Sequence, residues 1–319
     1  MEQDVKTFIE KIKNAKNIAI MGHKNPDGDS YCSVLALARL IELNYGLRPT
    51  CIYDGNIPEY LDEMPLRTWI KYYERVDLAE VYDLVIILDY GTPKYIGGAQ
   101  PIVDNAKFIV EIDHHQNDER LGMLCIDDEG AAATGQILFE IMQEAGWTFD
   151  KDVLDLLAVA LITDTGNFKF VRDGRVMQIM GELIDNGVVL RHLFEALRNK
   201  PRKSVLVESG AASRAEFWYK GKLAIAIVPH KDYKYLDGRG DTVLNLLGGI
   251  KGVEYIALLK EQKAEQTGVS LRSRGKPVNH IAEALGGGGH MCAAGAVVND
   301  TLENVQARII ELFRGEINQ

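Results

Sequence analysis

Residues 21–30 read MGHKNPDGDS and place one imidazole and two carboxylates in a short turn, in which a proline and a glycine alternate with the aspartates. The apolar residues 17–21 before the turn predict a buried strand, and residues 30–43 after it carry apolar side chains at helical spacing. Ligands of open α/β sheets bind in the loops that follow the carboxyl ends of strands, so this turn is a candidate divalent-metal site. Its candidate ligands are His23, Asp27 and Asp29.

The same turn also has a purely structural explanation. Asn-Pro and Asp-Gly are common turn dipeptides, and Asp29 or Ser30 could cap the N-terminus of the following helix. The turn alone leaves both explanations open, and the rest of the chain has to decide between them.

Two further strands are predicted to end in the same kinds of side chain. Residues 83–88 form a continuous apolar run, which is typical of a strand buried on both faces, and Asp89 follows it. Residues 107–112 form another such strand, and they are followed by Asp113, His114 and His115. A lone carboxylate after a strand often caps the next helix, but two histidines directly after an aspartate are harder to explain in that way. Both strand ends therefore favour metal binding.

A fourth acidic residue follows a predicted helix. Residues 153–163 are almost entirely apolar and predict a buried helix that runs into Asp164. This helix could simply end at Gly166. However, an acid at a helix C-terminus opposes the helix dipole, and a bound metal would remove that conflict.

Length and composition limit the class of protein. The 319 residues suit two domains, and 46% hydrophobic with 26% charged residues is typical of a globular chain. A net charge of −10 argues against a protein that grips long duplex nucleic acid. No apolar run approaches the roughly 20 residues of a membrane helix, and the first residues lack a signal-peptide pattern, so we expect a cytoplasmic protein. Residues 56–75 are rich in aromatics and receive no predicted role.

The second half of the chain contains a candidate anion site. A basic stretch, residues 191–203, marks the predicted junction between the domains, and residues 269–274 alternate as a half-buried strand does. Residues 286–290 read GGGGH, and their exposed backbone N–H groups could cradle a phosphate with Arg272 as a charged partner. The alternative is a flexible glycine loop. The small residues 293–296 are expected to lie on a closely packed helix.

These patterns predict an α/β fold with a larger N-terminal domain and a smaller α/β C-terminal domain. The first domain is expected to contain a mostly parallel sheet flanked by helices, and the active site is expected in the cleft between the domains. The predicted ranges are 1–188 for the first domain, 189–205 for the linker and 206–319 for the second domain.

The ordered motifs resemble those of the DHH phosphoesterase superfamily: residues 23–29, then Asp89, then residues 113–115, then Asp164. The GGGGH run with Ala293-Ala294-Gly295 resembles the signature of the DHH-associated C-terminal domain. In its length the chain resembles the small bacterial branch of nanoRNases and 3′-phosphoadenosine 5′-phosphate phosphatases. Relatives usually carry small residues and glycine where this chain has residues 30–33, Ser-Tyr-Cys-Ser.

The resemblance implies two divalent metal ions, commonly manganese, with Asp89 bridging them. It implies that His115 contacts the scissile phosphate and that Asp113 orients an imidazole. The implied metal ligands are His23, Asp27, Asp29, Asp89, His114 and Asp164. The implied substrate-binding residues are Arg272, Gly287, Gly288, Gly289 and His290.

The implied activity is hydrolysis of very short oligonucleotides, of 3′-phosphoadenosine 5′-phosphate, or of both. The alternative within the superfamily is a phosphodiesterase of cyclic dinucleotides or their linear products. A RecJ-type single-strand exonuclease ranks lower because an oligonucleotide-binding domain and a basic channel are missing, and a family II pyrophosphatase has another type of C-terminal domain. A non-catalytic nucleotide-binding protein ranks lowest because all six ligand positions are filled. The sequence leaves open whether the chain forms a homodimer.

Overall fold

The computed structural model describes residues 2–171, 173–236 and 240–317. Two compact units follow each other along the chain, one up to Arg198 and one from Asn199 onward. This division falls inside the predicted linker, residues 189–205, which is largely helical and contains α7 (Leu190–Arg198) and the start of α8 (Arg202–Ser213). Within the described ranges, no helix has both the length and the apolar character needed to cross a membrane.

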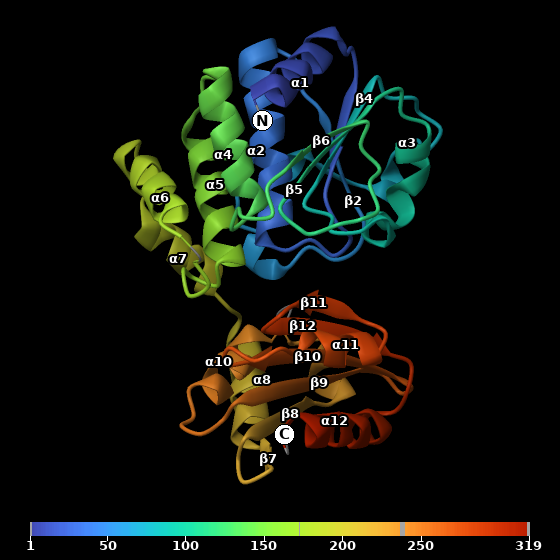
Figure 1. The fold of residues 1–319 in the computed structure, drawn as a ribbon, viewed down its shortest axis with the longest axis vertical. Coiled ribbons are helices and arrows are strands. Elements are labelled where there is room, and N and C mark those ends of the chain that lie inside the picture. Colours follow the sequence, from blue (N-terminus) through green and yellow to red (C-terminus); the bar gives the residue numbers. More distant parts are fainter. Residues whose placement is uncertain (1, 172, 237–239, 318–319) are drawn as a thin grey trace. The chain divides into compact units, whose positions relative to one another are not determined.

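The first unit is built on one sheet, in which the six strands found among the described residues all run parallel. Its strand order is β3-β2-β1-β4-β5-β6, which confirms the predicted parallel α/β architecture (Figure 1). The strands are β1 (Ile18–Met21), β2 (Thr50–Tyr53), β3 (Ile70–Tyr72), β4 (Leu84–Leu88), β5 (Ile109–Asp113) and β6 (Leu124–Asp127).

Helices cover both faces of this sheet, because its central strands are apolar on both sides. Ile20 and Ile86 pack with α1, α2, α4 and α5 on one face, whereas Ala19 and Val85 pack with α3 on the other (Figure 1). The helices of this unit, besides α7, are α1 (Glu2–Asn14), α2 (Gly28–Tyr45), α3 (Gln100–Asp104), α4 (Thr134–Ala145), α5 (Lys151–Asp164) and α6 (Arg175–Asp185).

The strand order reverses direction between β1 and β4, and this reversal positions the site. Chain connections leave β1 and β4 toward opposite edges of the sheet, which opens a crevice beyond their carboxyl ends. Because Met21 of β1 pairs with Ile87 of β4, His23 and Asp89 lie at matching positions just beyond the ends of these neighbouring strands. Leu88 in turn pairs with Ile112 of β5, so Asp89 also emerges beside Asp113.

Residues 56–75, which had no predicted role, form the outer edge of the sheet. They contain three short 3₁₀ segments (Glu59–Leu61, Arg67–Trp69 and Tyr73–Arg75) and the edge strand β3, which pairs with β2. Arg48 stacks on the ring of Trp69, with its guanidinium carbon 4.2 Å from the ring centroid. The aromatic side chains of this segment therefore serve packing at the sheet edge.

The second unit contains a mixed sheet of order β11-β12-β10-β9-β8-β7, given for the residues that are described. β8 and β9 are parallel and the other neighbours are antiparallel. Its strands are β7 (Glu216–Trp218), β8 (Leu223–Val228), β9 (Tyr255–Lys263), β10 (Gln266–Ser273), β11 (Gly288–His290) and β12 (Ala293–Val298). Its helices, besides α8, are α9 (His230–Tyr233), α10 (Asp241–Gly248), α11 (Asn279–Ala284) and α12 (Leu302–Ile317).

One expectation for this unit is wrong. The small residues 293–296 belong to strand β12, not to a helix. Their small size still serves close packing, because a Cβ added at Gly295 would lie 2.8 Å from the carbonyl oxygen of Val269 on the neighbouring strand β10. The last two glycines of the run before them, Gly288 and Gly289, belong to the edge strand β11, which pairs with β12.

Candidate metal centre

His23 lies just beyond the carboxyl end of β1. Its main-chain N–H donates to the Ser30 hydroxyl oxygen (3.1 Å), and its Nδ1 lies 2.9 Å from the carbonyl oxygen of Lys24. A proton on Nδ1 satisfies that carbonyl and leaves the lone pair on Nε2. Nε2 faces two carboxylates, with an Asp27 oxygen at 3.6 Å and an Asp89 oxygen at 4.0 Å. His23 is thus oriented to offer Nε2 to a metal.

The two aspartates of the turn are placed by the first turn of α2. Asp27 is the N-cap residue of this helix, and its carboxylate accepts a hydrogen bond from the N–H of Ser30 (3.1 Å). Neither of the expected capping residues, Asp29 and Ser30, occupies the N-cap position. Asp29 is instead fully buried and accepts a hydrogen bond from the Ser33 hydroxyl (2.9 Å). The first turn of α2 therefore both uses Asp27 as its cap and positions the predicted ligand Asp29.

Asp89 adopts an unusual backbone conformation, with a φ of 49° in the left-handed region. This region costs free energy for most residues and is tolerated best by glycine, asparagine and aspartate. The main-chain N–H groups of Tyr90 and Gly91 donate to one oxygen of Asp113 at 3.0 and 2.8 Å. Asp113 on β5 therefore holds the turn that presents Asp89.

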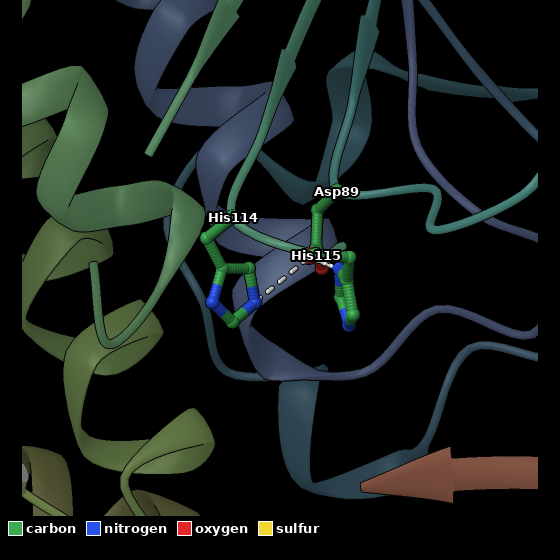
Figure 2. A group of neighbouring side chains, drawn as sticks. All are labelled: Asp89, His114 and His115. Atoms are coloured by element: carbon green, nitrogen blue, oxygen red, sulfur yellow. Dashed lines mark ion pairs between the residues drawn. The ribbon is translucent and has the colours of Figure 1, made fainter. Parts of the chain in front are cut away.

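Asp113 also fixes His115. Its second oxygen accepts from the His115 main-chain N–H (3.0 Å) and lies 2.8 Å from His115 Nδ1. The rings of His114 and His115 are in contact, with centroids 4.4 Å apart and planes at 60°. Both imidazoles approach the same oxygen of Asp89, at 3.5 Å from His114 Nε2 and 3.4 Å from His115 Nδ1 (Figure 2).

Asp164 is the last residue of α5 and reaches the same cluster. α5 can pack closely on the start of α2 because Gly28 has no side chain, and a Cβ there would lie 2.5 Å from Thr163 Oγ1. An Asp164 oxygen lies 3.4 Å from His114 Nε2, and an Asp29 oxygen lies 3.9 Å from the same nitrogen. The structure thus brings together residues that are 141 positions apart, His23 and Asp164.

The predicted ligands form overlapping groups whose nitrogen and oxygen donor atoms lie within 4.8 Å of one another. Asp89 belongs to two of these groups and offers one oxygen to each side, Oδ2 toward His23 and Oδ1 toward His114. Imidazole nitrogens combined with carboxylate oxygens fit divalent transition-metal ions. The groups are His23, Asp27 and Asp89; Asp29, His114 and Asp164; and Asp89, His114 and His115.

The close carboxylates and imidazoles shift one another's pKa values. Burial opposes a charge on His23, but the hydrogen bond and charge of Asp27 and the charge of Asp89 raise the pKa of His23 to about 9. Burial raises the pKa of Asp164 to about 6. The charges of neighbouring carboxylates act in the same direction, and the charge of His114 opposes them. Metal binding at such groups releases protons, so acid should weaken it.

The predicted substrate-binding residues all lie in the second unit. Arg272 on β10 makes an ion pair with Asp241 of α10 (3.2 Å) and donates to the carbonyl oxygen of Leu271 (3.0 Å). His290 ends β11 and pairs in register with Ala293 of β12. Gly287 has no room for a side chain, because a Cβ would lie 2.0 Å from the carbonyl oxygen of Gly295. The remaining two glycines of the prediction, Gly288 and Gly289, are the first residues of β11.

Sequence reasoning missed two residues that hold the predicted ligands. Thr134 donates its main-chain N–H to Asp29 (2.6 Å), and its hydroxyl lies 3.3 Å from an Asp89 oxygen. Ser33 donates to the other oxygen of Asp29. Ser33 lies one helical turn after Asp29, a spacing that could have identified it. Thr134 had no such local signal.

A fourth group of possible donors, Glu111, Cys125 and Asp127, lies elsewhere on the sheet. Arg120 places Nη1 2.6 Å from a Glu111 oxygen and 3.0 Å from an Asp127 oxygen. Its guanidinium already supplies the positive charge that this group needs, so we assign it a structural role.

Comparisons with known proteins identify a domain in each half of the chain. A model of the DHH family, N-terminal domain, matches residues 17–161, and a model of the DHHA1 domain matches residues 220–319. The chain contains a DHH N-terminal domain followed by a DHHA1 domain. The first match contains all predicted metal ligands except Asp164, and the second contains all predicted substrate-binding residues.

Several relatives match this chain over nearly its whole length. It is 28% identical to the bifunctional oligoribonuclease and PAP phosphatase NrnA of Thermus thermophilus, over 95% of this chain and 90% of that protein. It is 26% identical to the Bacillus subtilis protein of the same name, over 91% and 92%. The cyclic-di-AMP phosphodiesterase GdpP of B. subtilis is 25% identical, over 97% of this chain but only 50% of GdpP.

The fold also matches a solved structure. A crystal structure of an exopolyphosphatase-related protein from Bacteroides fragilis superimposes with a TM-score of 0.91 at 22% identity, covering 100% of this chain and 98% of that one. This likeness supports the assigned fold.

The hydrogen bonds of Asp113 predict a pH dependence of stability. Burial alone would raise the pKa of Asp113, but the hydrogen bonds from His115 and Gly91 outweigh it and lower the pKa to about 2. Because an unfolded aspartate titrates near 3.9, the folded state binds this proton more weakly, so the stabilisation is present above pH 4 and is lost as pH falls toward 2. Between pH 5 and pH 2, we expect the unfolding free energy to fall by about 2 kcal/mol more in the wild type than in Asp113→Asn. Urea titrations of both proteins measure this difference, and equal slopes would contradict it.

Proposed function

We propose that this chain is a metal-dependent phosphoesterase that hydrolyses very short oligonucleotides and 3′-phosphoadenosine 5′-phosphate. The observation that carries the proposal is the position of Asp89, whose two oxygens face different sets of His and Asp donors. A carboxylate in that position can bridge two metal ions. Relatives named oligoribonuclease and PAP phosphatase, which match nearly the whole chain, support the substrate class.

The proposed centre holds two divalent ions, with Mn²⁺ as the expected metal. When bound, such ions supply a hydroxide nucleophile near neutral pH and neutralise the phosphoryl oxygens. The first ion would be held by His23, Asp27 and Asp89, and the second by Asp29, Asp89, His114 and Asp164.

His115 is the proposed proton donor to the leaving ribose oxygen. Burial opposes a charge on this ring, but its hydrogen bond to Asp113 and the charge of Asp89 outweigh burial and raise its pKa. With Nδ1–H held by Asp113 at 2.8 Å, the second proton of the imidazolium is on Nε2. Asp113 thereby fixes which nitrogen of His115 acts on the substrate.

The second unit is proposed to bind another phosphate of the substrate, through Arg272 and residues 287–290. Arginine recognises phosphate through paired N–H donors, and closely approached glycines expose backbone N–H groups. Both kinds of donor would favour a substrate that carries a second phosphate.

Replacing Arg272 by alanine is expected to weaken substrate binding with little effect on the chemical step. KM for a 5′-phosphorylated RNA dinucleotide should rise about 10- to 100-fold, the loss of a charge-assisted hydrogen bond, while kcat changes less than about threefold. Steady-state kinetics with saturating Mn²⁺ measure both constants. The matched control is Arg274→Ala, just past the end of β10, where the arginine donates to the main-chain oxygens of Gly248 and Ile250. An unchanged KM in Arg272→Ala would contradict the proposed role.

A substrate panel with Mn²⁺ tests the proposed function. It contains a 5′-phosphorylated RNA dinucleotide, a pentamer, a long RNA, 3′-phosphoadenosine 5′-phosphate, cyclic di-AMP and pyrophosphate. Fast cleavage of the dinucleotide and of 3′-phosphoadenosine 5′-phosphate, with slow attack on long RNA, is the expected result. Preference for cyclic di-AMP would replace the proposal by a role in cyclic-dinucleotide turnover. No activity on any substrate would overturn the metal-centre assignment.

A further inference from the structure

Helix α4 begins without a capping side chain of its own. The residue before it is Ala133, which has no side-chain oxygen to accept from the first N–H groups. The N–H groups of Thr134 and Gly135 donate instead to the two oxygens of Asp29, at 2.6 and 3.0 Å. Asp29 lies 105 residues earlier in the chain, on α2. The N-terminus of α4 therefore fixes the carboxylate of a predicted metal ligand.

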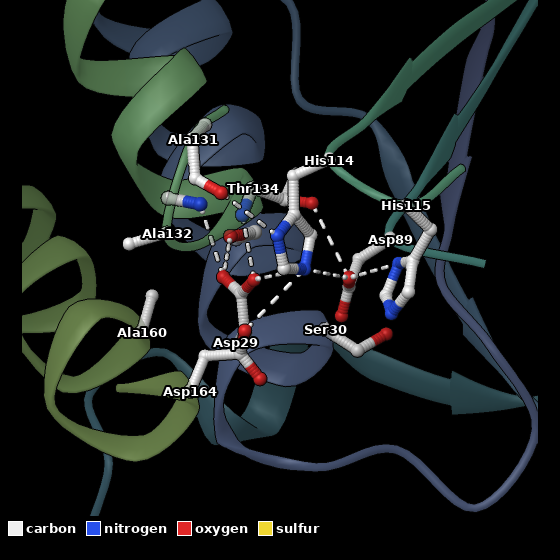
Figure 3. A network of polar contacts seen from close by, with 12 residues as sticks. Asp29, Ser30, Asp89, His114, His115, Ala131, Ala132, Thr134, Ala160 and Asp164 are labelled. Carbon is white, nitrogen blue, oxygen red and sulfur yellow. Dashed lines mark hydrogen bonds and ion pairs between the residues drawn. The ribbon is translucent and has the colours of Figure 1, made fainter. Parts of the chain in front are cut away.

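The side chain of Thr134 contacts a second predicted ligand. Its hydroxyl oxygen lies 3.3 Å from Asp89 Oδ1, and Thr134 is fully buried. Thr134 thus donates to two carboxylates, through its N–H to Asp29 and through its O–H to Asp89 (Figure 3).

The two oxygens that Thr134 contacts are the ones that face His114. His114 Nε2 lies 3.9 Å from Asp29 Oδ2 and 3.5 Å from Asp89 Oδ1. These atoms and Asp164 form the set of donors proposed for the second ion. The first set uses Asp89 Oδ2 with His23 and Asp27, whereas the Thr134 hydroxyl contacts Asp89 through Oδ1. Thr134 is therefore placed to act on one side of the centre only.

We propose that Thr134 is a positioning residue for the second metal ion. Its hydroxyl holds Asp89 Oδ1 by a hydrogen bond, while its N–H fixes Asp29 independently. This inference rests on the proposed two-metal function. Residues that orient metal ligands typically change metal affinity 10- to 100-fold when they are replaced.

Two substitutions separate the hydroxyl from the packing of the side chain. Thr134→Val keeps the shape and the main-chain N–H but removes the hydroxyl, whereas Thr134→Ser keeps the hydroxyl and removes a methyl group. Calorimetric titration with Mn²⁺ alone gives the number and affinity of bound ions without substrate. We expect Thr134→Val to weaken the second ion about 10- to 100-fold and the first ion less than threefold. We expect Thr134→Ser to bind both ions within about threefold of wild type.

The opposite order of Mn²⁺ affinities in these two variants would overturn the inference. If Thr134→Val binds both ions as wild type does and Thr134→Ser is the weaker binder, then only the packing of this side chain matters.

An Asp89→Asn titration distinguishes this failure from a failure of the proposed function. If Asp89→Asn loses ions that Thr134→Val retains, the two-metal proposal stands and the role of Thr134 falls. If the wild type binds no ions, both fall. Electron paramagnetic resonance of the Mn²⁺ pair provides a second readout, because the coupling between two ions should appear only at higher Mn²⁺ concentrations in Thr134→Val than in wild type.

Discussion

Asp89→Asn is expected to lower kcat/KM for the RNA dinucleotide by on the order of 10³-fold or more. An amide oxygen can bind only one ion weakly and cannot bridge two, whereas each ion contributes several kcal/mol to stabilising the transition state. At 1.36 kcal/mol per tenfold in rate, the loss of one ion accounts for the expected decrease. Single-turnover rates with excess enzyme and millimolar Mn²⁺ measure this decrease without interference from product release.

The fold should survive this substitution. Asparagine tolerates the left-handed backbone of residue 89, where φ is 49°, nearly as well as aspartate does. Removing this carboxylate relieves its repulsion of Asp29 and Asp164 but also removes its attraction to neighbouring histidines, so the metal-free variant should melt close to wild type. Asp104→Asn is the control, because Asp104 is exposed at the end of α3 and contacts Gln100. Full activity in Asp89→Asn would show that Asp89 does not bridge metals.

Lys200→Met is expected to destabilise the second unit by about 3–5 kcal/mol. Lys200 Nζ lies 2.9 and 3.1 Å from the two carboxylate oxygens of Glu208 on α8, and 3.0 Å from the Thr242 hydroxyl on α10. Glu208 is fully buried, and the Lys200 side chain is only 16% exposed. Removing the lysine leaves a buried carboxylate without its counter-charge, which costs far more than the pair itself contributes. Thermal and urea unfolding of the full chain measure the change.

Two further variants check this explanation. The double variant Lys200→Met with Glu208→Leu removes both charges and should recover most of the lost stability, because well-packed apolar residues replace buried ion pairs at little cost. Lys203→Met is the matched control, since this exposed lysine lies over the ring of Tyr235 at 5.0 Å and should contribute no more than about 1 kcal/mol. A double variant as unstable as Lys200→Met would point to packing and not to charge.

The central strands and the predicted ligands could be read from the sequence because both signals are local. The apolar run at residues 83–88 predicts β4 within one residue. The turn at residues 21–30 contains side chains of the types that bind divalent metals. The paired histidines 114 and 115 were informative because few structural roles require them together. The parallel sheet then follows, since it places several strand ends at one edge.

The remaining features depend on contacts between distant segments. β3 and β6 are edge strands whose side chains are mostly only partly buried, so no continuous apolar run marks them in the sequence. Residues 293–296 are small and were assigned to a helix, but in the fold they pair with β10 and β11, and pairing partners outweigh local propensity. Thr134 and Asp29 meet only because α4 packs beside α2, which sequence spacing cannot reveal.

The use of the Asp29 carboxylate as the cap of α4 has an evolutionary consequence. A lineage that abandons catalysis can lose Asp89 or His114 without disturbing the start of a helix, but loss of Asp29 would leave two buried N–H groups of α4 without an acceptor. Homologues that have lost activity should therefore retain Asp29 after the other predicted ligands have been substituted. A surviving aspartate at this position is then weak evidence of activity, and the residue at position 89 is the better marker of a working enzyme.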